Sequence, residues 1–188
     1  MFNGGISIMS ELRTNRIVPR DGLVSGAGIG GGIIQIKSTN VTAGTFYTNS
    51  TSFTDITGMS VTITPTRSDS KIFIMSNLCY GGSDNFYGGV KLLRDSTAIG
   101  LSTWPTGIQT AATFTVMIGD GDYGQYKTFT AAHQILDTPS TTSAVTYKLQ
   151  VMAYASSASF YLNRPWSGNN SDYIFGGSST ITAMEVSG

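Results

Sequence analysis

The chain has 188 residues, which is room for one compact domain and an appendage, because a domain of about 150 residues already buries roughly two-thirds of its unfolded surface. Its 11 basic and 11 acidic residues cancel, and charged residues make up only 12% of the chain. This balance excludes a cationic surface for a phosphate backbone, so we expect no nucleic acid partner. The sequence contains neither a signal-peptide pattern nor an apolar run long enough for a membrane helix, so we expect synthesis in a cytoplasm and no membrane insertion.

Residues 1–32 differ in composition from the rest of the chain. Residues 1–24 combine arginines with more apolar side chains than a solvated tail usually carries, which indicates burial against a partner. A Gly-rich run follows at residues 26–32, and such a run behaves as a flexible joint. We therefore predict an extended arm and joint over 1–32 and a β-sandwich domain over 33–188.

From residue 33 onward, short apolar or alternating runs are separated by turn residues at intervals of about ten. This spacing is typical of an antiparallel β-sandwich or jelly roll, and no segment has the apolar period of a capped α-helix. The fold class that we predict is all-β, with an extended N-terminal arm. The expected strands are 33–37, 45–48, 59–64, 71–80, 89–94, 98–101, 111–118, 126–136, 145–155, 159–163 and 179–186.

Two of these strands carry further information. In 145–153, large apolar residues alternate with polar ones, which predicts one buried face. In 71–80, both faces carry large apolar groups, so both need cover. In an antiparallel sandwich the second cover usually comes from another subunit; the alternative is that the arm or a long loop covers it.

Four long connections, at 81–88, 102–110, 119–125 and 165–177, place aromatic rings among glycine and polar residues. Rings on such loops are typical of binding surfaces, and they can stack on sugar faces. The alternative is that they close the ends of the sandwich or pack against neighbouring subunits. The rings concerned are Phe86, Tyr87, Trp104, Tyr123, Trp166 and Tyr173.

The residue types needed for catalysis are scarce. The single histidine, His133, has no nucleophile or metal motif beside it, and the single cysteine, Cys79, lies in an apolar run, so we predict structural roles for both. One of each cannot supply a His/Cys metal site, and Asp120 with Asp122 fits a tight turn better than a calcium loop. The glycines at 26–32 lack the preceding strand and following helix of a dinucleotide site. We therefore predict no enzyme, no catalytic residue, no metal and no cofactor.

Several stretches of the chain resemble one family. The segment 10–22 reads SELRTNRIVPRDG and is similar to the N-terminal signature of small tail-fibre-like virion proteins of tailed bacteriophages. The segment 53–65, FTDITGMSVTITP, is similar to the first sandwich strands of the same family. Further matches in the same order stand at 32–36, 70–72, 92–95, 136–139, 146–150 and 179–186. The leader 1–8 precedes the start that is usual in the family.

The resemblance implies a homotrimer of jelly rolls, similar in build to the trimeric heads of the tumour necrosis factor and complement group. It also implies a short tail fibre in the virion tail, made in the cytoplasm of a bacterial host, with the heads facing a host surface glycan or protein. On this basis Trp104, Tyr123 and Trp166 are expected to contact the host. The arm would bind other virion proteins, either of the tail adaptor or nozzle type or of the capsid, through Leu12, Arg13, Arg16, Ile17, Val18, Pro19 and Arg20.

Two other functions stay open at the level of sequence. A capsid decoration or head-fibre protein would use the same trimer and arm, and only its copy number per particle would differ. A glycan-hydrolysing depolymerase would need a pair of carboxylates, which can meet in the fold without being close in sequence.

Overall fold

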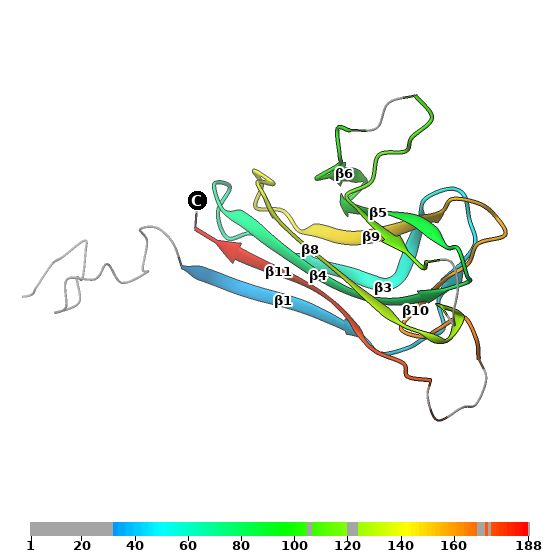
Figure 1. Ribbon diagram of the computed structural model, residues 1–188. Helices are drawn as coiled ribbons and strands as arrows, with labels where there is room; N and C mark the ends of the chain where they lie inside the picture. Colours follow the sequence, from blue (N-terminus) through cyan, green and yellow to red (C-terminus); the bar gives the residue numbers. More distant parts are fainter. Residues whose placement is uncertain (1–31, 105–106, 120–123, 169–171, 173, 188) are drawn as a thin grey trace, which may run out of the picture.

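The structure is a computed structural model that describes residues 32–104, 107–119, 124–168, 172 and 174–187. Two antiparallel sheets pack face to face, as the sequence predicted (Figure 1). The described residues include no α-helix, only the single 3-10 turn η1 (Gly124–Tyr126). Residues 1–31, which hold nearly all of the predicted arm and joint, lie outside the described residues.

Sheet A contains four long strands, and two short strands extend it at one end. Its long strands are hydrogen-bonded in the order β1, β11, β4, β8, and β10 joins the end of β4 to β2. Their bounds are β1 (Ile33–Val41), β11 (Ser179–Val186), β4 (Lys71–Gly82), β8 (Phe129–Asp137), β10 (Phe160–Leu162) and β2 (Tyr47–Thr48).

Sheet B faces sheet A across the core. Its strands run in the order β3, β9, β5, and the far edge of β5 is shared by β6 and β7. Their bounds are β3 (Thr54–Ile63), β9 (Val145–Ala153), β5 (Tyr87–Arg94), β6 (Thr97–Ile99) and β7 (Phe114–Met117).

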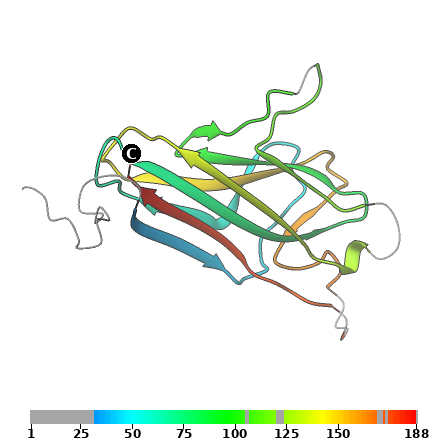
Figure 2. The same ribbon diagram turned by 60° about the vertical axis from the view of Figure 1, so that its left-hand side comes forward.

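The pairing of the long strands is nested along the chain. β1 pairs with β11, β3 with β9, β4 with β8 and β5 with β7. A long hairpin with this nesting, rolled up so that alternate pairs fall in opposite sheets, is a jelly roll. Figure 2 shows the four long strands of sheet A side by side in front of sheet B. The predicted all-β antiparallel sandwich is therefore confirmed, whereas the arm predicted with it lies outside the described residues.

All eleven expected strands are present, with shifted ends. The main difference is β3, which begins at Thr54 and not at residue 59. Its register with β9 shifts between Asp55 and Ser60, and Gly58 within this bulge has a φ of 86°. A positive φ is accessible to glycine at little cost, so the strand continues through a residue that usually interrupts strands.

The core lies between the sheets and follows the period-two alternation of the strands. In β9 the alternate residues Val145, Tyr147, Leu149, Val151 and Ala153 are buried, which confirms the predicted single dry face. Burial of each such large side chain contributes about 1.5–3 kcal/mol. The two sheets are therefore held together mainly by these inward rows.

One of the rings predicted to lie on an exposed connection belongs to the core. Phe86 is fully buried, and its ring centroid lies 5.9 Å from that of Phe160. Because β4 extends to Gly82 and β5 begins at Tyr87, the connection is shorter than predicted and turns its ring inward. Cys79 is a buried free thiol, as predicted, and burial raises its pKa.

A buried carboxylate closes the end of the sandwich at which β11 ends. Glu185 Oε1 accepts hydrogen bonds of 2.7 Å from the backbone N and from Oγ1 of Thr66, and its Oε2 accepts one of 2.6 Å from Gln35 Nε2. The buried Ser70 hydroxyl lies beside it without a hydrogen bond of standard geometry. Burial alone would raise the pKa of Glu185, but these donors lower it to about 2.

Candidate interaction face on the outer side of sheet A

The registers of sheet A align outward-facing side chains in rows across its four long strands. In one row Ile36 lies opposite Met184, Met184 opposite Phe73, and Phe73 opposite Leu136. Ile36 is 54% exposed and Leu136 is 51% exposed. An apolar row therefore crosses the whole sheet on the side that faces away from the core.

On one side of the apolar row, two further rows of the same face are uncharged, whereas on the other side the exposed Lys71 lies opposite Val186. The next row is Ser38, Thr182, Met75 and Gln134, in which the Ser38 and Thr182 hydroxyls are 2.8 Å apart and hydrogen-bonded. The row after it contains Asn40, Thr180, Asn77 and Ala132. None of the side chains in these two rows is ionisable, whereas a solvated sheet face usually carries Lys, Glu or Arg.

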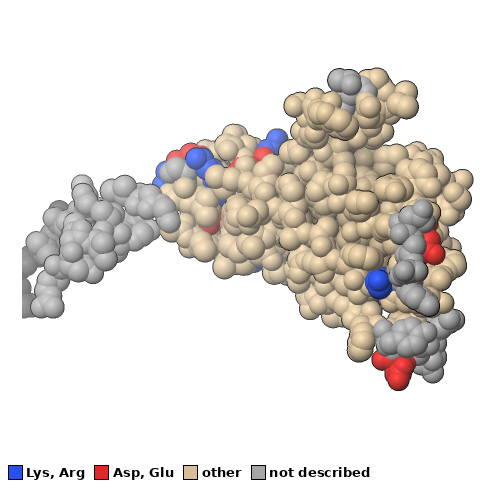
Figure 3. Space-filling view, viewed as in Figure 1, with Lys and Arg blue, Asp and Glu red and all other residues tan. Residues whose placement is uncertain are grey.

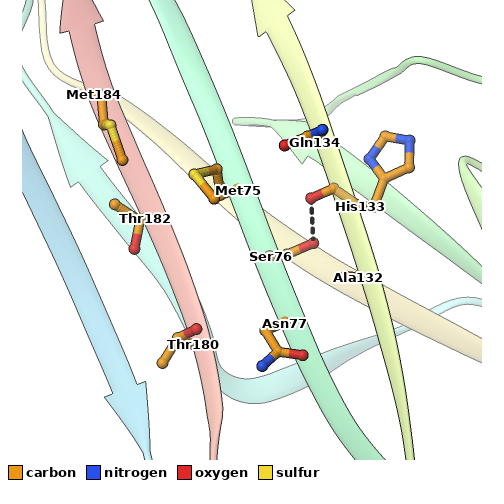
Figure 4. Close-up of a pocket in the computed structure, with 9 residues that line it drawn as sticks. All are labelled: Met75, Ser76, Asn77, Ala132, His133, Gln134, Thr180, Thr182 and Met184. Carbon is orange, nitrogen blue, oxygen red and sulfur yellow. Dashed lines mark hydrogen bonds between the residues drawn. The ribbon is translucent and has the colours of Figure 1, made fainter. Parts of the chain in front are cut away.

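Between these strands the face is hollowed by a depression of about 580 Å³. Figure 4 shows Thr180, Thr182 and Met184 on β11, Met75 and Asn77 on β4, and Gln134 on β8. The lining is a mixture of thioethers, hydroxyls and amides without charge. Its chemistry suits a protein surface of similar polarity better than an ionic ligand.

The outer edge of this face is an open strand edge. Among the described residues β8 pairs only with β4, so its other side carries no strand. Residues 129–136 of β8 contain no proline and no charged residue. Natural proteins usually protect an edge strand with such residues, and an unprotected one can pair or pack with another chain.

The predicted second cover of strand 71–80 is present at one end only. Cys79, on the outward-facing side of β4, is buried, and a Cβ built on Gly177 would lie 2.5 Å from its Sγ. The connection before β11 therefore covers this end, in line with the loop alternative. Phe73 is only partly buried and Met75 is exposed. Their side of β4 is left uncovered by the described residues.

The host-contact residues predicted from sequence do not form one surface. Trp104 is 76% exposed in the connection between β6 and β7, and Trp166 is 43% exposed in the connection between β10 and β11. These two connections leave opposite sides of the sandwich in both views (Figures 1 and 2). Trp166 lines only a shallow hollow, with Gln125 and Tyr126.

Some of the predicted sites lie outside the described residues. This is so for the virion-anchoring set Leu12, Arg13, Arg16, Ile17, Val18, Pro19 and Arg20, and for Tyr123, Tyr173, Asp120 and Asp122. Over the part of the chain that is described, no helix is long and apolar enough to cross a membrane.

The His133 side chain packs against the sandwich and does not face the hollow. Its ring stacks on Phe114 with centroids 5.3 Å apart, burial lowers its pKa, and Figure 4 shows the imidazole turned away from the hollow. In the described ranges no three His, Cys, Asp or Glu residues come together in a way that could hold a metal ion. The outer face of sheet A is therefore the candidate interaction face of the described residues.

No protein-family model matches the chain, and no curated protein matches it.

Proposed function

We propose that this chain is a structural protein of a bacteriophage particle that forms a homotrimer through the outer face of sheet A. The observation that supports the assembly is the outer face of sheet A, with its exposed apolar row, the two uncharged rows beside it and its open β8 edge. Interface cores are depleted of charged residues in the same way. The virion role is supported by the resemblance of segments 10–22 and 53–65 to tail-fibre-like virion proteins.

A second copy of the chain is the partner that this face fits best. These rows have no charge pattern that demands a complementary partner, so copies related by symmetry can pack on one another through them without ionic mismatch. Ile33 and Val186 pair at one end of sheet A, so residue 32 leaves the sandwich beside the apolar row. In an assembly built on this face the N-terminal segments of the copies would leave together from one end.

In the proposed arrangement these segments attach the trimer to the tail. Residues 12–20 would contact an adaptor or nozzle-type protein of the tail, and the sandwich would face the host as a short fibre. Trp104 stands on a projecting connection and is the most exposed of the predicted contact residues that the structure describes. A glycan or protein of the host surface is the proposed ligand.

Sedimentation of the full chain tests the assembly. We expect a trimer at about 10 μM protein, and we expect Leu136→Lys or Met75→Lys to dissociate it, because each places an ammonium group among uncharged side chains. Leu101→Lys is the matched control, since Leu101 is also an exposed apolar residue but follows β6 of sheet B. A wild-type chain that is monomeric at this concentration would refute the proposal.

Phage particles test the attachment. Particles carrying a chain without residues 1–24 should lack this protein, while the shortened chain still sediments as a trimer. Imaging of wild-type particles then separates a tail fibre from a capsid decoration protein, because the copies would follow the symmetry of the tail or of the capsid. Incorporation of the shortened chain at wild-type copy number would contradict the role given to the arm.

A further inference from the structure

A second groove lies on the outer face of sheet B, on the opposite side of the sandwich. Its walls include Tyr87 on β5, Met117 on β7 and Tyr154 just after β9, together with Ile108 from the connection between β6 and β7. Tyr87 lies opposite Met117 in the register, and its backbone oxygen accepts a hydrogen bond from Tyr154 N. These three side chains therefore form a row across neighbouring strands.

The two tyrosines hold each other in place while staying accessible. Their ring centroids are 5.5 Å apart and their planes meet at 82°, an edge-to-face contact. Tyr87 is 45% exposed and Tyr154 is 56% exposed. One ring can thus offer its face to a ligand while the other fixes its orientation.

The lining of the groove continues on β5 beyond the rings, where it includes Gly88 and Gly89. In the adjacent row Gly89 lies between Thr115 and Met152, and the absence of a side chain lets Ala112 and Phe53 pack closely over it. A Cβ at Gly89 would already contact Ala112 Cβ at 3.2 Å. The groove has a volume of about 490 Å³, within the range of about 300–1,000 Å³ that is usual for ligand sites.

The lining indicates the class of ligand. It contains no Asp, Glu, Lys or Arg, and its polar side-chain groups are hydroxyls of Thr110, Thr115 and the two tyrosines. The nearby Lys91 ammonium lies 4.0 Å from the centre of the Phe53 ring, so it is engaged elsewhere. On the side of the molecule that Figure 3 shows, the charged side chains gather towards the ends and most of the surface is uncharged. A neutral ligand fits such surroundings, whereas a phosphate or carboxylate would lose its hydration without a counter-charge.

We propose that this groove binds a neutral saccharide. A pyranose ring has an apolar C–H face that packs on an aromatic ring and hydroxyls at its rim that need donors and acceptors, as tyrosine and threonine hydroxyls provide. The proposal rests on the proposed function and names the substrate class of its host contact. The groove lies on the sheet opposite to the self-association face, so the trimer leaves it open.

Saturation-transfer NMR on the full chain, with glucose, mannose and galactose hexasaccharides at about 5 mM, tests the inference, since dissociation constants near 1 mM are the range expected of such small neutral ligands. We expect transfer to at least one hexasaccharide, and weaker transfer to a hexagalacturonate of the same length. Tyr154→Ser or Tyr87→Ser should weaken binding about tenfold.

Tyr47→Ser is the matched control, because Tyr47 is also an exposed, ring-stacked tyrosine but belongs to sheet A. Its binding should equal that of the wild type. Absence of transfer to all three neutral hexasaccharides, or equal loss in the control, would overturn the inference. So would a change of oligomeric state in the Tyr154→Ser variant, which would identify a second copy as the occupant. Sedimentation is read separately, so a monomer that still binds saccharide would refute the trimer and leave this groove standing.

Discussion

At the scale of single residues, Glu185 shows that the period-two alternation of a strand can predict the burial of a charged side chain. In the segment 179–186, Ile181 and Ala183 share one face, and the same period places Glu185 among these buried residues. The pattern thus contained a signal for a buried carboxylate. Its partners, Gln35 and Thr66, are 150 and 119 residues away in sequence, so only the fold could identify them.

Glu185→Gln should destabilise the domain by about 2–3 kcal/mol at pH 7. The amide nitrogen of glutamine cannot accept a hydrogen bond, so the Thr66 donors or Gln35 would be left facing another donor in a site that solvent does not reach. Urea unfolding of wild type and variant at pH 7 measures the difference. An equal midpoint in both chains would contradict it.

The same carboxylate should make the wild type sensitive to acid. Its pKa is lowered to about 2 in the folded state, against about 4.3 when unfolded, so its contribution is complete above about pH 5 and is lost as the pH falls towards 2. The stability gap between wild type and Glu185→Gln should therefore shrink between pH 5 and pH 3. Asp69→Asn, which removes an exposed carboxylate paired with Arg67, should change stability little.

At the scale of elements, every strand could be located from apolar alternation and turn residues, but not every strand end. The predicted start of β3 at residue 59 was wrong, since β3 begins at Thr54 and runs through Gly58. In the structure the chain pairs with β9 on both sides of that glycine, and a bulge absorbs it. A bulge depends on the partner strand, so a single segment cannot reveal it.

Gly58→Ala should lower stability by about 1–2 kcal/mol. The φ of 86° is costly for a residue with a Cβ, and the new methyl group would lie 3.2 Å from Val41 Cγ2. Gly119→Ala is the control, since a Cβ there would meet nothing within 4 Å. Thermal melts of the two variants should differ by several degrees, and identical melting temperatures would show that the bulge tolerates alanine.

At the scale of the whole molecule, the interaction face could be predicted only in part. The two apolar faces of 71–80 indicated that β4 needs a second cover, but Ile36, Met184 and Leu136 gave no such sign in their own segments. They form a row with Phe73 only because β1, β11, β4 and β8 are brought together in a definite register. Such pairing joins segments that are far apart in sequence, and local pattern does not encode it.

The absence of ionisable side chains from these rows leads to a prediction about how self-association of the chain depends on salt. Self-association through the rows of Ile36, Ser38 and Asn40 involves no ion pair, so the association constant should change less than about twofold between 50 mM and 1 M NaCl, because salt screens charges and not apolar contacts. Sodium sulfate should strengthen association, since it favours burial of apolar surface. Sedimentation velocity at each salt concentration measures both effects.

Gln134→Glu provides the comparison on the same face, because Gln134 lies in the row of Ser38, Thr182 and Met75, on the edge strand β8. The substitution keeps the size of the side chain but buries a carboxylate without a partner, so association should weaken roughly tenfold. It should also become dependent on NaCl, because the carboxylates of neighbouring copies repel one another and salt screens that repulsion. A wild-type assembly that dissociates steeply with rising NaCl would mean that charged residues hold the copies together, and the outer face of sheet A, which has none in these rows, could not then be the interface.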